Sequence, residues 1–265
     1  MAAVTTSRIG SILKLSLSSG PVNALSPPLI TALANEIAAA NTPKSGVTGI
    51  LLASAAPKVF SAGLDLTQLS VSPSSKNNRE SVSKYIGSFQ NLVHALAGSH
   101  VPTAAVVHGA CPAGGTVLAF CTDYKVASSI QRSYFCMGLN ETRVGLAPPL
   151  WLHALARNNL NSARIADRLV QLGYLCSSPQ ESLQHGYLDA VIADATPEAL
   201  EAHAIEQLNQ LAAIPWNARV QAKLGARKEM LSLLENGNTD EMVDCILGDE
   251  FQSVTAQLMA SLKKK

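Results

Sequence analysis

Apolar runs in the first half of the chain predict a series of β-strands. Between residues 9 and 17, apolar residues alternate with polar or small ones, which is the pattern of a strand with one buried face. The run at 47–54 is continuously apolar and predicts a strand covered on both faces. Residues 102–109 and 123–128 predict two further strands.

Segments of helical period lie between these strands. Ser26 followed by Pro27 predicts a helix start, because serine caps helices and proline is favoured at the first helical position. Apolar residues at helical spacing predict a second helix over 80–98. The polar segment 70–80 before it is typical of a surface loop, either a lid or a linker. Alternating strands and helices predict an α/β sheet with crossover connections.

The last third of the chain is predicted to be mostly helical. Helical patterns cover residues 151–172, 197–213, 217–236 and 239–262. We therefore expect two parts, a core with the sheet at residues 1–195 and a helical region at residues 196–265.

Composition indicates extensive burial and argues against nucleic acid as a partner. Of the 265 residues 47% are hydrophobic and 15% are charged, well below the roughly 25% charged residues of an average soluble protein. A protein with so few charged residues is expected to have part of its surface hidden in contacts between subunits. The net charge of +1 provides no field that would attract DNA or RNA.

Cysteine usage and hydropathy narrow the classes further. The five cysteines are scattered without a C-x-x-C or a zinc spacing, so we expect a reducing compartment and no metal. No apolar run reaches the length of about 18 residues that a membrane span requires. Arg8 and Lys14 occur in an N-terminal stretch without acids, but the alternation there indicates a strand rather than a transit peptide.

Two small-residue turns are the first candidates for chemistry. Gly109 and Gly114 have the spacing of a phosphate-binding loop, but Gly115 stands where that motif requires lysine. A turn of this kind provides either free backbone N–H groups or close packing of helix on sheet. The segment 61–66 (SAGLDL) also follows a strand, and two such turns could converge as an oxyanion hole.

Isolated polar residues are the second set of candidates. Glu141 lies among apolar residues in MGLNETRVGLAPPLW. Asp65 is either a second acid or a helix cap, and the cap is the favoured interpretation because it adjoins a turn. His108, at the end of an apolar strand, is interpreted as structural, and Trp151 as core or pocket lining.

Four segments in order resemble the crotonase (enoyl-CoA hydratase/isomerase) superfamily. They are PVNALS at 21–26, KVFSAGLDLTQL at 58–69, VPTAAVVHGACPAGGTVLAFCTDYKVAS at 101–128, and LVQLGYLCSS with HGYLDAVI within 169–192. The resemblance implies a spiral of repeated ββα units with C-terminal helices that build a homotrimer, sometimes a hexamer. It also implies a fatty enoyl-CoA substrate, no separate cofactor and a mitochondrial location.

Within the superfamily, GACPAGG with GLNETRVGLAPPLWL is most similar to Δ3,Δ2-enoyl-CoA isomerases of β-oxidation. The hydratases of the family use two glutamates. The position of the first is occupied here by Val117, whereas the second falls on Glu141. The resemblance thus implies a 1,3-proton shift by one base, with the backbone N–H groups of Leu64 and Gly114 as oxyanion donors. Apolar surroundings are expected to raise the pKa of the Glu141 carboxyl to about 6–7.

Further site residues follow from the resemblance alone. The segment that binds coenzyme A corresponds to Ala62, Gly63, Leu64, Asp65 and Leu66, and Lys58 is a candidate partner for the nucleotide phosphates. Asn140 is expected to orient substrate or carboxylate. The acyl pocket is expected to include Leu139, Leu146, Pro148, Pro149 and Trp151.

Two alternatives stay open at this point. One is another crotonase-type activity, either a weak enoyl-CoA hydratase or a dienoyl-CoA isomerase, for which Asp65 would be the second acid. The other is a non-catalytic trimeric scaffold, against which the intact Glu141 and both turns argue.

Overall fold

The computed structural model describes residues 3–71, 78–131, 133–237 and 239–262. Its main sheet has six strands in the order β1-β2-β3-β4-β6-β8. The strands are β1 (Val4–Ile9), β2 (Ile12–Leu17), β3 (Gly49–Ser54), β4 (Thr103–Val106), β6 (Tyr124–Ser128) and β8 (Ala190–Ile192). All neighbours pair in parallel except β1 and β2. A separate parallel pair consists of β5 (Ala110–Pro112) and β7 (Cys136–Gly138). The predicted α/β class with crossover connections is confirmed.

The N-terminal alternation corresponds to a hairpin rather than to one strand over residues 9–17. The chain turns at Gly10, whose φ of 61° suits glycine, so β1 precedes the expected strand and pairs back onto β2. Within β2 the predicted alternation holds, because Leu13, Leu15 and Leu17 all belong to the main core. The pattern located the buried face correctly but did not reveal the turn.

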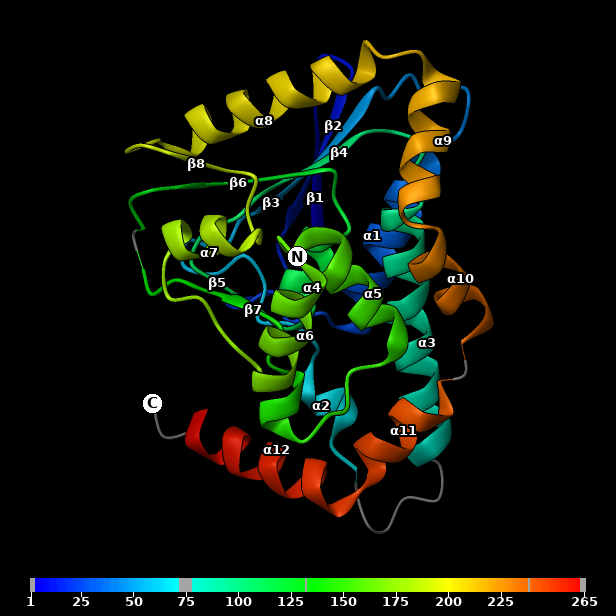
Figure 1. The fold of residues 1–265 in the computed structure, drawn as a ribbon, viewed down its shortest axis with the longest axis vertical. Coiled ribbons are helices and arrows are strands. Elements are labelled where there is room, and N and C mark those ends of the chain that lie inside the picture. Colours follow the sequence, from blue (N-terminus) through cyan, green and yellow to red (C-terminus); the bar gives the residue numbers. More distant parts are fainter. Residues whose placement is uncertain (1–2, 72–77, 132, 238, 263–265) are drawn as a thin grey trace.

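Helices cover both faces of the main sheet (Figure 1). On one face, α8 (Pro197–Ala212) packs against β3, β4 and β6. The other face carries the larger hydrophobic core, to which α1 (Pro27–Ala40), α3 (Asn78–Ala97) and α4 (Gly114–Phe120) contribute. Helix α1 begins at the predicted Ser26–Pro27 start and packs against α3.

Each of three predicted long helices is two helices in the structure. The pairs are α5 (Leu150–Asn159) with α6 (Ala163–Leu172), α9 (Trp216–Ala226) with α10 (Lys228–Asn236), and α11 (Asp240–Leu247) with α12 (Asp249–Leu262). Ser162 caps α6 through Ile165 N–H, and extended backbone at Gly248 separates α11 from α12. At the α9–α10 break, the Arg227 guanidinium donates to the carbonyls of Ala97, Cys121 and Thr122. Local capping and core contacts thus override helical periodicity.

The C-terminal helices share the core with the rest of the chain. Helix α10 packs on α3 and α5, and α11 packs on α3. The division at residues 195 and 196 stays a prediction. Short elements complete the chain: α2 (Leu66–Leu69), the 3₁₀ turn η1 (Glu141–Val144) and α7 (Pro179–His185).

Three further expectations concern the polar segment 70–80, the cysteines and membrane-spanning helices. In the segment 70–80, residues 72–77 lie outside the described residues, so the choice between lid and linker stays open. All five cysteines are free thiols. No helix in the described part of the chain is both long and apolar enough to cross a membrane.

Candidate active site

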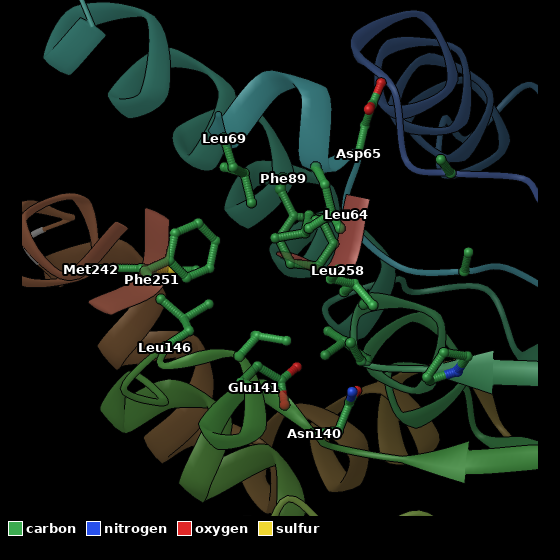
Figure 2. Close-up of a pocket in the computed structure, with 18 of the residues that line it drawn as sticks. Leu64, Asp65, Leu69, Phe89, Asn140, Glu141, Leu146, Met242, Phe251 and Leu258 are labelled. Carbon is green, nitrogen blue, oxygen red and sulfur yellow. The ribbon is translucent and has the colours of Figure 1, made fainter. Parts of the chain in front are cut away.

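A mostly apolar cavity of about 380 Å³ lies between the ends of several elements (Figure 2). The segment 62–67 and α4 contribute backbone and small residues, and η1 contributes Glu141. Side chains from α3, α5, α11 and α12 complete the wall. The volume lies within the range of about 300–1,000 Å³ that is usual for small-molecule sites.

The first turn, residues 61–64, presents a free backbone donor. The N–H of Leu25 donates to the carbonyl of Gly63 at 2.8 Å. Because a trans peptide is planar, the N–H of Leu64 on the same peptide points the opposite way. Gly63 has a φ of 87°, a conformation that favours glycine. Leu64 N–H has no acceptor within the described part of the chain, and Leu64 lines the cavity.

The second turn, residues 112–115, presents the N–H of Gly114 in the same way. Ala113 adopts a positive φ of 48° and its own N–H donates to Gly138 O at 2.8 Å. The carbonyl of Ala113 accepts from Val117 N–H at 3.0 Å, so Gly114 N–H points away from α4. Nothing in the described ranges accepts from this N–H.

The two turns are in direct contact, and glycine is required there. A Cβ on Gly114 would lie 3.2 Å from Leu64 N, and a Cβ on Gly63 would lie 3.0 Å from Gly114 N. A Cβ on Gly115 would lie 2.5 Å from the carbonyl oxygen of Ser61. The turns therefore bring two unpaired N–H donors together, as an oxyanion hole requires.

Glu141 is the buried acid of this cavity. Its side chain is 8% exposed, and its Oε2 has no hydrogen-bond partner among the described residues. Loss of hydration on burial raises the pKa of the Glu141 carboxyl to about 7, partly offset by a hydrogen bond from its own backbone N–H. A carboxyl with this pKa exchanges protons efficiently near neutral pH.

The turn that carries Glu141 is held by its neighbours. Thr142 Oγ1 donates to Val170 O at 3.3 Å and Arg143 Nε donates to Leu172 O at 3.1 Å, both on α6. Leu146 N–H donates back to Glu141 O at 3.0 Å. On α11, the Cys245 thiol donates to Gly145 O at 3.2 Å and accepts from Ala147 N–H at 3.3 Å. The position of the carboxylate is thus set by two packed helices.

Two further polar atoms in the cavity have no hydrogen-bond partner in the described part of the chain, whereas the second acid, Asp65, has one. Asn140 Oδ1 and Trp151 Nε1 are buried without hydrogen bonds from the described residues. Asp65 Oδ1 accepts from Thr67 N–H at 3.0 Å and caps α2. Figure 2 shows its carboxylate directed away from Glu141. The cap interpretation of Asp65 is therefore confirmed.

Comparison with known proteins assigns the chain to a family. The family model described as enoyl-CoA hydratase/isomerase matches residues 8–244. The chain belongs to the enoyl-CoA hydratase/isomerase family. Human "Enoyl-CoA delta isomerase 1, mitochondrial" is 34% identical to this member over 251 residues, which are 92% of this chain and 78% of the human protein. The mouse protein of the same name is 30% identical over 254 residues, 95% of this chain and 83% of its own.

Solved structures agree with this family assignment. The crystal structure of human mitochondrial delta3-delta2-enoyl-CoA isomerase superimposes with a TM-score of 0.89 at 31% identity, covering 99% of this chain and 98% of that one. An enoyl-CoA hydratase from Bacillus halodurans, at 21% identity, shares the fold with a TM-score of 0.81 over 96% of this chain and 99% of its own. The predicted crotonase-type fold is confirmed.

Most site residues expected from the family resemblance meet in the cavity. Those that line it are Ala62, Leu64, Asp65, Leu66, Gly114, Asn140, Glu141, Leu146, Pro149 and Trp151. Gly63 lies directly behind Gly114. Lys58 is exposed and does not line the cavity. His108 Nε2 hydrogen-bonds the Ala56 carbonyl at 2.8 Å, as its structural interpretation predicted.

Sequence reasoning missed the apolar end of the cavity. That end is lined by Leu69, Phe89, Met242 and Phe251, whose side chains come from helices that are far apart in the sequence. All except Leu69 were accounted for as apolar residues of a helical pattern, and Leu69 as part of the segment 58–69 that carries the family resemblance. The pattern marks a buried face, but it does not say which buried residues border an empty space. No cluster of metal-ligating side chains occurs in the described ranges.

Proposed function

We propose that this family member is a Δ3,Δ2-enoyl-CoA isomerase that converts 3-enoyl-CoA, cis or trans, to trans-2-enoyl-CoA in the β-oxidation of unsaturated fatty acids. The observation that carries the proposal is one buried carboxyl, Glu141, in the same apolar cavity as the paired N–H groups of Leu64 and Gly114. The names of the human and mouse relatives point to the same reaction.

The reaction follows from these groups. The Glu141 carboxylate removes a proton from C2 of the 3-enoyl thioester, and the electrons of that bond spread over the dienolate onto the thioester oxygen. The N–H groups of Leu64 and Gly114 stabilise this oxygen, and the loss of one such donor typically costs about 3–4 kcal/mol of barrier. The protonated Glu141 then returns the proton to C4, which gives the conjugated product and restores the carboxylate.

The chemistry around Glu141 suits isomerisation better than hydration. A hydratase must hold and activate a water as well as move a proton, for which family hydratases use two carboxylates. Here Val117 lines the cavity and is 1% exposed, so the wall at that position is apolar. Asp65 is committed to capping α2. One available carboxyl matches a 1,3-proton shift.

The remaining contacts concern the coenzyme A thioester. We place the thioester along the Ala62–Leu66 segment, with Asn140 and Trp151 offering unpaired polar atoms to the substrate. Lys58, exposed on the turn that precedes this segment, is placed near the nucleotide phosphates. No cofactor beyond the coenzyme A of the substrate is needed for a proton shift.

We further propose a mitochondrial homotrimer, with a hexamer as the larger form. Large hydrophobic side chains are exposed on the isolated chain, among them Tyr134 at 73% and Leu150 at 69%. Together with the low share of charged residues, 15%, this exposure supports a surface that is partly hidden between subunits. The location rests on the mitochondrial relatives, although an Arabidopsis enoyl-CoA isomerase of the peroxisome also matches part of the chain, at 26% identity over 175 residues.

The decisive experiment compares the native protein with Glu141→Gln on 3-enoyl-CoA substrates. Formation of the conjugated thioester is followed by absorbance and the product is identified by chromatography. We expect 2-enoyl-CoA without hydroxyacyl-CoA, and a loss of about 10²–10⁴-fold in kcat for Glu141→Gln. Asp65→Asn, which retains a capping side chain, is expected to keep kcat. Hydroxyacyl product, or full activity of Glu141→Gln, would overturn the proposal.

A further inference from the structure

The hydroxyl of Tyr85 joins Asp65, the residue that follows the first turn, to Leu25, the residue whose N–H holds that turn. Tyr85 lies on α3 and is 5% exposed. Its hydroxyl donates to Leu25 O at 2.7 Å and accepts from Asp65 N–H at 2.8 Å. Tyr85 does not line the cavity, so it is not placed to touch substrate. Its two bonds nevertheless end on residues that flank the oxyanion turn.

These bonds close a ring around Leu64. Leu25 donates through its N–H to Gly63 O, and its carbonyl accepts from Tyr85. The peptide that follows Leu64 is held through Asp65 N–H, on the same hydroxyl. Both peptides next to the Leu64 Cα are therefore fixed, and with them the direction of its N–H. One phenol oxygen, on helix α3, closes this ring.

We propose that Tyr85 is a positioning residue that orients the Leu64 N–H toward the developing oxyanion. The inference rests on the proposed isomerase function and assigns a role to a residue outside the cavity. Burial raises the pKa of the Tyr85 phenol well above its ordinary value, so the hydroxyl keeps its proton and can donate and accept at once. Phe89, one turn further along α3, lines the cavity itself, so the same helix borders the acyl space.

The proposed role depends on the Tyr85 hydroxyl, and Tyr85→Phe removes this group while keeping the ring. The variant leaves Leu25 O and Asp65 N–H without their partner inside the protein, where unpaired polar groups are costly. The turn is then free to rotate these peptides toward other partners. Substrate contacts made by side chains of the cavity are unchanged, so the loss falls on stabilisation of the dienolate and not on binding of the thioester.

The test compares Tyr85→Phe with Tyr124→Phe on a 3-enoyl-CoA. Tyr124 lies on β6, outside the cavity lining, and its hydroxyl makes one hydrogen bond of 2.9 Å with His203, so its variant matches the chemical change. For Tyr85→Phe we expect kcat to fall about tenfold with KM within about twofold, whereas Tyr124→Phe keeps kcat. The pH midpoint that reports Glu141 is expected to stay in place in both variants. If Tyr85→Phe is recovered unfolded, Tyr85→Met is the second variant, because a flexible apolar side chain fills much of the space of the ring and buries no unpaired polar group.

A second readout does not depend on turnover. A 3-oxoacyl-CoA ionises to an enolate, and the near-ultraviolet absorbance of the bound enolate reports how well the oxyanion donors stabilise it. We expect weaker enolate formation on Tyr85→Phe than on the native protein or Tyr124→Phe. Unchanged kcat and unchanged enolate absorbance would overturn the role of Tyr85 while leaving the isomerase proposal intact. A native protein that binds the enolate without isomerising 3-enoyl-CoA would instead overturn the isomerase proposal.

Discussion

The polar end of the cavity is built from backbone, whereas its apolar end is built from side chains. At the polar end, the peptides of Leu64 and Gly114 meet in turns so close that a Cβ on either Gly63 or Gly114 would fall 3.0–3.2 Å from the other turn. At the apolar end, Met242 of α11 and Phe251 of α12 form the wall with other side chains. At the polar end, Gly63 and Gly114 leave little room for a larger residue, whereas at the apolar end substitutions can change the volume of the cavity.

This difference suggests that the polar end determines the rate of the reaction and that the apolar end determines which acyl chains are accepted. The proposed oxyanion donors depend on backbone geometry, which one added methyl group would disturb. The acyl space depends on side-chain volume, which hydrophobic substitutions change at moderate cost. We therefore expect substitutions in the turns to lower kcat for every substrate, and substitutions in α11 and α12 to alter the preference for acyl length.

Among the substitutions that leave Glu141 in place, the largest effect is expected from Gly114→Ala at the polar end. The added Cβ would lie 3.0 Å from Leu25 Cδ1 and 3.2 Å from Leu64 N, so it would crowd the turn and cover a donor. Loss of one oxyanion donor lowers kcat by about 10²–10³-fold. Steady-state kinetics with 3-enoyl-CoA of two chain lengths would measure the loss, which should be equal for both.

The matched control for this substitution is Gly87→Ala on α3. A Cβ at Gly87 meets nothing within 4 Å, so the methyl group has room. Alanine inside a helix is expected to add about 0.5–1 kcal/mol to the free energy of unfolding without changing kcat. Retention of full activity by Gly114→Ala would mean that the second turn does not donate to the oxyanion.

The second prediction concerns how the ionisation of Glu141 changes the free energy of unfolding. The pKa of Glu141 is raised from 4.5 to about 7, so between these values the folded protein holds a proton that the unfolded chain has lost. The stabilising contribution of the protonated form is complete below pH 4.5 and is lost as pH rises to about 7. Glu141→Gln cannot ionise, so its free energy of unfolding should exceed that of the native protein by about 3 kcal/mol at pH 8.

Denaturant unfolding at pH 4.5 and pH 8 would measure this difference, which should vanish at the lower pH. The same ionisation governs catalysis with the opposite sign, because the proton can be removed from C2 only by the carboxylate. The kcat/KM of the native protein should therefore rise with pH through a midpoint near 7. A stability gap that does not depend on pH would show that Glu141 has an ordinary pKa in the folded protein.

The polar end could be predicted from the sequence to a greater extent than the apolar end. The segments SAGLDL and ACPAGG are local, and each contains the small residues that its turn needs, so both turns could be located before the fold was known. Glu141 stood out as an isolated acid in an apolar segment. That the two turns could converge was inferred from their positions after strands, and the contact between Gly63 and Gly114 explains it physically. Their assignment to one site with Glu141 came from the family resemblance.

The apolar end and the support of the first turn could not be predicted in this way. Phe89, Phe251 and Met242 differ from other buried apolar residues only in bordering a space, which depends on how α3, α11 and α12 pack. The bridge from Tyr85 to Leu25 and Asp65 joins positions 60 and 20 residues apart. Neither a periodic pattern nor a short motif records contacts over such separations.

The smallest effect is expected from Phe251→Leu at the apolar end. Phe251 is 1% exposed and lines the cavity from α12, so a smaller side chain lengthens the space for the acyl chain while leaving Glu141 and both turns in place. We expect the ratio of kcat/KM for a longer to a shorter 3-enoyl-CoA to rise by about three- to tenfold, which is the discrimination that one or two methylene groups give in an apolar pocket.

Phe120→Leu is the matched control, because Phe120 is fully buried against Tyr187 and is not part of the cavity wall. Both variants should lose similar stability, but Phe120→Leu should keep the native ratio. Equal ratios in the two variants would mean that α12 does not limit acyl length, and the contrast between a backbone end and a side-chain end would then describe only the architecture of the cavity and not its specificity.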